Sequence, residues 1–123
     1  MISGQVNLHF EPKVCIFIDD SKGQPQPVDV TIDTGFTGFL SLPSALITGL
    51  GLGWMQKRNV QLADGSVVGL DVYSATVIWD GQPRKVEAYS CNSAPVIGMR
   101  ILIGYEVKMR VIAGGPVWID VVP

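Results

Sequence analysis

A tight turn at the end of an apolar segment constrains this chain more than any other feature. Residues 28–32 read VDVTI, in which apolar and polar side chains alternate as in a half-buried β-strand. This segment leads directly into Asp33, Thr34 and Gly35. A glycine at the third position allows backbone angles that a residue with a Cβ would resist. We therefore expect Asp33 to be presented at a sharp, rigid turn at a strand end, with Thr34 beside it as a hydrogen-bond donor.

The composition predicts one folded domain over residues 1–123. The chain has 123 residues, of which 47% are hydrophobic and 16% charged, and this length supplies one core but not two. The formal net charge is −2 and no basic cluster is present, which argues against nucleic-acid binding. No apolar run approaches the ~20 residues of a membrane span, and residues 1–12 lack the blocks of a signal peptide. We expect a cytoplasmic protein that does not bind membranes.

The two cysteines and the single histidine offer little for metal or nucleophilic chemistry. Cys15 lies in the apolar run VCIFI, so we expect it to be a small core residue. A disulfide between Cys15 and Cys91 is disfavoured in a cytosolic chain. His9 falls on the polar side of an alternating segment and has no partner at metal-ligand spacing. We expect no metal, no cofactor and no Cys–His or Ser–His catalytic pair.

The remaining pattern predicts an all-β protein with one or two short helices. A helix is expected over residues 41–50, with Pro43 near its start and Gly49 near its end. The run GxGxG at 49–53 closes this helix, whereas a dinucleotide-binding loop follows a strand and opens a helix, so a helix stop is favoured. Further strand-like segments are expected at 5–10, 13–19, 58–63, 67–79, 84–91, 105–113 and 116–122.

Two further landmarks follow the Asp33 turn in the sequence. Asp64-Gly65 is a hairpin signal between two strand-like segments. Residues 61–68, QLADGSVV, are then either ordinary sheet or a mobile flap over a cleft. The second landmark is Val96-Ile97-Gly98, which we prefer to Leu102-Ile103-Gly104 because residues 99–102 can form a helical turn after it.

The order of these landmarks resembles that of the retropepsin-like aspartic proteases. These carry Asp-Thr-Gly, then a glycine-tipped hairpin, then two apolar residues and a glycine before a short helix. The similarity is strongest to the small single-domain bacterial type and covers nearly the whole chain. It rests on the segments DTGFTGFL, LSLPSALITGLGL, LADGSVV and VIGMRILIGYEV, and on the Gly-Gly hairpin near the end. The resemblance implies an acid-protease fold, a mainly β, closed barrel lobe.

The resemblance also assigns roles to residues. Asp33 is implied to be the catalytic carboxylate, Thr34 to bond to the loop of a partner copy, and Gly35 to complete the catalytic turn. The apolar-apolar-glycine segment is implied to pack beneath this loop and hold it. Phe36 stands where retroviral enzymes carry a small residue, which adds bulk near the cleft. The residues implied to contact a peptide substrate are Phe36, Ala63, Asp64, Gly65 and Ser66.

The number of carboxylates then predicts the assembly. Peptide hydrolysis of this kind needs two carboxylates, one to activate water and one to protonate the substrate carbonyl, and the chain holds one Asp-Thr-Gly. A two-fold homodimer would place Asp33 against its own symmetry mate. We predict a homodimeric aspartic endopeptidase acting on peptides or proteins. The alternatives are a dimeric peptide- or partner-binding module with little turnover, and a structural β-domain in which Asp-Thr-Gly occurs by chance.

Overall fold

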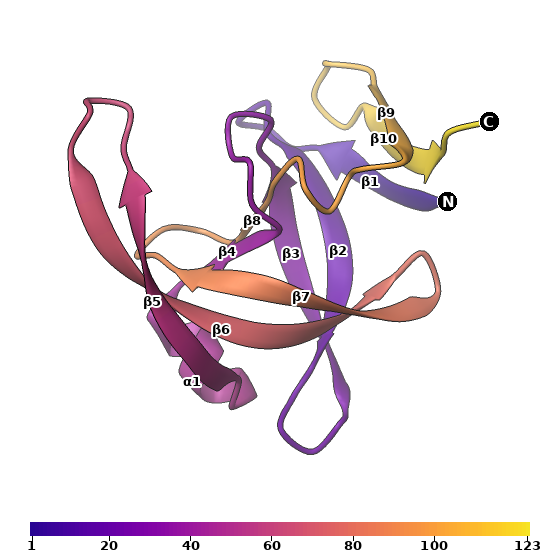
Figure 1. Cartoon of the computed structure of the whole chain (residues 1–123). Helices are drawn as coiled ribbons and strands as arrows, with labels where there is room; N and C mark the ends of the chain where they lie inside the picture. The colour runs from indigo at the N-terminus through magenta and orange to yellow at the C-terminus, as the bar shows by residue number, and fades with distance from the viewer.

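Ten strands and one short helix make up the fold in the computed structural model, which describes all residues 1–123 (Figure 1). The mainly β prediction is therefore confirmed. No helix has the length and apolar character that crossing a bilayer requires. The elements are β1 (Ile2–Val6), β2 (Pro12–Asp19), β3 (Pro25–Ile32), β4 (Leu40–Leu42), α1 (Ser44–Leu50), β5 (Gly53–Gln61), β6 (Val67–Trp79), β7 (Gln82–Ser90), β8 (Val96–Ile97), β9 (Tyr105–Met109) and β10 (Pro116–Val121).

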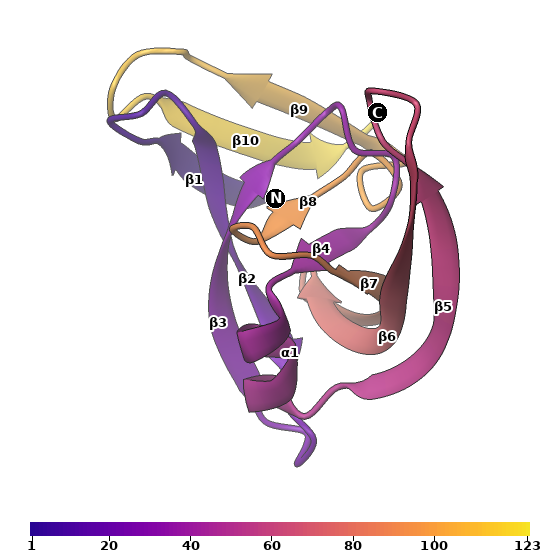
Figure 2. The ribbon, with the colours of Figure 1, turned by 90° about the vertical axis from the view of Figure 1, so that its left-hand side faces the viewer.

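The strands form one sheet that closes on itself. Its order is β5-β6-β7-β4-β8-β3-β2-β1-β10-β9, and an additional pairing joins β6 to β2. The ring from β6 through β7, β4, β8, β3 and β2 back to β6 is the closed barrel that the resemblance implied. Figure 2 shows β1, β10 and β9 extending from one side of this barrel, with β5 on the other side.

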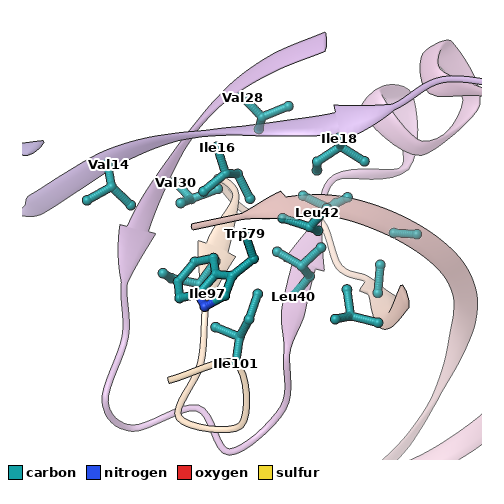
Figure 3. Close-up of a cluster of buried hydrophobic side chains, with 14 of the residues drawn as sticks. Val14, Ile16, Ile18, Val28, Val30, Leu40, Leu42, Trp79, Ile97 and Ile101 are labelled. Atoms are coloured by element: carbon teal, nitrogen blue, oxygen red, sulfur yellow. The ribbon is translucent and has the colours of Figure 1, made fainter. Parts of the chain in front are cut away.

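The core lies inside this barrel and is filled mainly by aliphatic side chains. Alternate residues of β2 and β3 point inward, and they meet Trp79, Ile97 and Ile101 from elsewhere in the chain (Figure 3). Full burial of one such side chain contributes about 1.5–3 kcal/mol. The inward residues of the two strands are Val14, Ile16, Ile18, Val28, Val30 and Ile32.

Two expectations for the N-terminal part were wrong. Cys15 is exposed, because it alternates with the buried Val14 and Ile16 and so lies on the outer face of β2. The strand expected at 5–10 ends at Val6, and a turn follows it. The Oδ1 atom of Asn7 accepts hydrogen bonds from the amides of His9 (3.0 Å) and Glu11 (2.9 Å). This local capping of the backbone ends the strand despite the apolar alternation.

One short helix is present, within the one or two expected, but it is shorter than the expected 41–50. Ser41 and Leu42 belong to the buried strand β4, which pairs with β7 and β8, so α1 begins only after Pro43. Gly51 ends α1, since its amide donates to the carbonyls of Ile47 and Thr48, and the glycine run is a helix stop as predicted. Residues 99–102 form hydrogen-bonded turns in place of a second helix.

Candidate active site

Asp33 directly follows β3 and is tied to β8 through its backbone. Its amide donates to the carbonyl of Ile97 at 2.9 Å, and its own carbonyl accepts from the amide of Phe36 at 3.2 Å. The Oδ1 atom of its carboxylate accepts from the amide of Gly35 at 2.9 Å. Asp33 is nevertheless solvent-exposed. The loop therefore fixes one carboxylate oxygen and leaves the group open to an incoming molecule.

The Val96-Ile97-Gly98 segment packs against the Asp33 loop and is bonded to it through the backbone. The amide of Gly98 donates to the carbonyl of Phe39 at 3.0 Å, and that of Met99 donates to the carbonyl of Phe36 at 2.8 Å. A Cβ on Gly98 would overlap the carbonyl oxygen of Gly38 and would lie 2.6 Å from the ring and the carbonyl oxygen of Phe36. Only a glycine allows the two chain segments to approach this closely.

The reason for the glycine at position 35 differs from the one expected. Gly35 does not adopt the left-handed conformation that glycine alone takes readily. A Cβ there would instead lie 3.3 Å from the Oδ1 atom of Asp33. Gly35 thus makes room for the carboxylate that its own amide binds.

Thr34 is exposed, and its hydroxyl makes no hydrogen bond within the chain. Together with Asp33 it lines a shallow pocket of about 480 Å³, whose walls include Glu11, Ser93 and Val96. The donor beside Asp33 is therefore free for a group from outside this chain.

The hairpin between β5 and β6 is built as the Asp64-Gly65 signal predicted. Gly65 has a φ of 86°. The amide and hydroxyl of Ser66 donate to the Oδ1 atom of Asp64 at 2.9 Å and 2.6 Å. These bonds, that of the hydroxyl first, hold the pKa of the Asp64 carboxyl below its usual value. The tip of the hairpin rises on the same side of the molecule as the loop between β3 and β4 (Figure 1).

The structure brings the end of β5 to the Asp33 loop, while the hairpin tip lines none of the pockets described. Val60 and Gln61 line a second pocket, of about 330 Å³, with residues 35–39 of the loop. Ala63, Asp64, Gly65 and Ser66 are exposed and lie outside it. Of the residues implied to contact substrate, only Phe36 lines this pocket.

We call this second pocket the charged pocket. It is lined by residues 35–39, Arg58, Val60, Gln61, Glu87, Tyr89 and Arg100. Two nitrogens of Arg58 donate to the two carboxylate oxygens of Glu87 at 3.0 Å and 2.9 Å, and one also donates to the Tyr89 hydroxyl at 3.2 Å. The bonds from Arg58 hold the pKa of Glu87 below its usual value, and those same bonds raise the pKa of Arg58. The Tyr89 ring contacts Phe36 edge-on, with ring centres 5.9 Å apart.

Sequence reasoning did not single out four residues of this pocket: Arg58, Glu87, Tyr89 and Arg100. One signal was present: Glu87 and Tyr89 lie two residues apart on a strand and so share a face. Their meeting with Arg58 depends on the order β5-β6-β7, and that with Arg100 on the turn after β8. Neither is visible in the spacing of residues along the chain.

The solved structures that are similar to this chain include three proteases. The first is the EIAV protease complexed with the inhibitor HBY-793, with a TM-score of 0.57 and 22% identity over 79% of this chain and 89% of that one. The simian foamy virus (mac) protease has a TM-score of 0.51 and 14% identity, over 72% of this chain and 91% of that one. A retropepsin-like aspartic protease from Rickettsia conorii has a TM-score of 0.56 and 11% identity, over 98% of this chain and 94% of that one.

No protein-family model matches the sequence, and no curated protein matches it either. The likeness to solved structures is therefore one of fold. The chain has the retropepsin-like fold of aspartic proteases, as its three landmarks predicted.

Proposed function

We propose that this chain is a single-domain aspartic endopeptidase that works as a homodimer, with Asp33 of each copy in one shared active site. One observation carries the proposal. Within a retropepsin-like fold, the exposed Asp33 carboxylate sits on a loop bonded to β8 at Ile97, where Gly98 allows close packing. A pure binding module has no need of a pair of carboxylates that activates water.

The single Asp-Thr-Gly requires a second copy. Asp33 and the unbonded hydroxyl of Thr34 are both exposed, so a two-fold axis near them can bring each Asp33 to its mate. At roughly 3 Å, two carboxylates cannot both be ionised readily, so the pair shares one proton. Each Thr34 would then donate to the partner's loop.

In the proposed reaction the ionised carboxylate takes a proton from water as the water oxygen bonds to the carbonyl carbon of the scissile peptide. The protonated carboxylate gives its proton to the carbonyl oxygen, and a diol forms without a covalent bond to the protein. The C–N bond of the diol then breaks. One carboxylate returns a proton to the nitrogen, and the other takes a proton from a diol hydroxyl, which leaves an acid and an amine.

The substrates are peptides or proteins in an extended conformation. Residues 61–68 act as a flap that covers the bound peptide and excludes bulk water. This chemistry uses no metal and no cofactor. We place the protein in the cytoplasm, which fits its two free thiols, Cys15 and Cys91.

The test is a peptide-library digest at acidic and neutral pH with the wild type, Asp33→Asn and Asp29→Asn. Asp29 is an exposed carboxylate on β3, the strand that leads to Asp33, and serves as the matched control. We expect cleavage by the wild type and by Asp29→Asn, with a bell-shaped pH dependence below neutrality, and only background cleavage by Asp33→Asn. Cleavage by Asp33→Asn at the wild-type rate would refute the proposal. Peptide binding without cleavage by any of the three would favour the binding module.

A further inference from the structure

The charged pocket adjoins the Asp33 turn, because Gly35 belongs to both. Residues 36–39 form the wall of the pocket on the side of the loop, and Arg58, Val60 and Gln61 form the wall on the side of β5. An extended peptide advances about 3.3 Å per residue. A peptide with its scissile bond at Asp33 therefore carries a flanking side chain past this opening.

The pocket holds an uncompensated positive charge. The charge of Arg58 is matched by Glu87, to which it donates two hydrogen bonds. Arg100 is in none of the ion pairs of the chain. Two positive groups and one negative group leave a net charge of about +1 in the lining.

Two contacts orient the guanidinium of Arg100, and neither neutralises its positive charge. Its Nε atom donates a long hydrogen bond to the carbonyl of Thr37 at 3.5 Å. Its guanidinium lies 6.0 Å from the centre of the Phe39 ring. These contacts leave its two terminal nitrogens, each with two N–H donors, without a side-chain acceptor. A guanidinium fork of this kind matches a carboxylate in shape and charge.

We propose that the charged pocket is a specificity pocket in which Arg100 binds an acidic side chain of the substrate peptide. The inference rests on the proposed peptidase function and names its substrate class. The rings of Phe36 and Tyr89 and the side chain of Val60 cover the aliphatic stem of the bound residue. The carboxylate at its end pairs with Arg100. The carboxylate of Glu87, which is bound to Arg58, repels the substrate carboxylate from its own side of the pocket.

The test uses matched peptides that differ only by Glu or Gln at one position flanking the scissile bond. We expect the kcat/KM of the wild type to be about tenfold higher for the Glu peptide than for the Gln peptide. A charge-assisted hydrogen bond at a partly exposed site contributes about this much. In Arg100→Gln the ratio should fall to about 1, and Arg100→Lys should keep part of it. Arg110→Gln is the matched control. Arg110 also lies over an aromatic ring, that of Trp118 at 5.7 Å, but outside the pocket, so this variant should keep the wild-type ratio.

Two further measurements sharpen the result. Glu87→Gln should raise the preference for Glu, since it removes the negative charge from the pocket. Salt at ~1 M should lower the preference of the wild type itself, because exposed charges are screened; this readout needs no variant to fold. An equal rate for both peptides in the wild type, or the same ratio in Arg100→Gln, would overturn the inference.

The failure of this inference can be told from that of the proposed function. Cleavage of both peptides with no preference overturns the pocket assignment alone. If no peptide is cleaved, binding of the same two peptides to the wild type and to Arg100→Gln is measured directly. Arg100-dependent binding of the Glu peptide would then support the pocket and overturn the peptidase proposal. No binding of either peptide would overturn both.

Discussion

The Asp33 loop and the β5–β6 hairpin border the same pocket but are held in different ways. The loop is bonded to a distant part of the chain: the amides of Asp33, Gly98 and Met99 link it to the segment at β8. The bonds at the hairpin tip are internal, as in the pair between the amide of Leu62 and the carbonyl of Ser66 at 2.8 Å. A segment with few tertiary contacts opens at a lower free-energy cost. The fold thus combines a carboxylate fixed by long-range bonds with a hairpin tip that is held by its own internal bonds.

The largest effect is expected when the packing between the Asp33 loop and the segment at β8 is disturbed. Gly98→Ala puts a methyl group against the carbonyl of Gly38, so either the loop or β8 must shift. We expect a loss of about 1–3 kcal/mol in the free energy of unfolding, measured in denaturant, and a larger fractional loss of peptidase activity. Gly49→Ala is the control, because a Cβ on that residue of α1 meets nothing within 4 Å. Wild-type stability and activity in Gly98→Ala would show that the close approach is not required.

A smaller effect on stability is expected at the hairpin. Gly65→Val forces a β-branched residue into a φ of 86°, which costs about 1–3 kcal/mol locally. The tip residues are exposed and a Cβ on Gly65 meets nothing within 4 Å, so the tip can deform without unfolding the barrel. We expect the melting temperature to fall little and the peptidase rate to fall clearly. If both stay unchanged, residues 61–68 are not a working flap.

The smallest effect concerns the charge at the hairpin tip. Hydrogen bonds from Ser66 lower the pKa of Asp64, so their stabilisation is present above the ordinary aspartate pKa of 3.8 and is lost as the pH falls through the lowered pKa. In an NMR titration, the Asp64 midpoint should lie below 3.8 in the wild type and rise in Ser66→Ala. Asp20, whose pKa is lowered mainly by the amide of Gln24, should keep its midpoint in both proteins. An unchanged Asp64 midpoint would contradict this assignment.

The contrast between local and long-range contacts also explains which features could be predicted from the sequence. The Asp33 turn, the hairpin signal at Asp64-Gly65 and the supporting segment 96–98 are local patterns. Their order along the chain resembles that of the retropepsin-like proteases, and this resemblance predicted the fold. Cys15 was misplaced because VCIFI is apolar on both faces, and only the sheet decides which face is inward. The strand expected at 5–10 was ended by the side chain of Asn7, which competes for backbone amides.

The charged pocket could not be predicted because strand pairing creates it. Arg58 on β5 and Glu87 on β7 lie 29 residues apart and meet across the intervening strand β6. Arg100 reaches the same pocket from the turn after β8. The first meeting depends on the order β5-β6-β7 and the second on where β8 pairs in the sheet, and no local pattern encodes either.

The most direct test of the central claim is subunit mixing. Wild-type protein is unfolded and refolded with an about tenfold excess of Asp33→Asn, so that most wild-type subunits pair with a variant subunit. If the two Asp33 carboxylates form one site, the peptidase activity should fall to about a tenth of that of the wild type refolded alone. An excess of Asp29→Asn, which keeps Asp33, should not lower it. Undiminished activity in the Asp33→Asn mixture would show that each chain works alone and would contradict the shared active site.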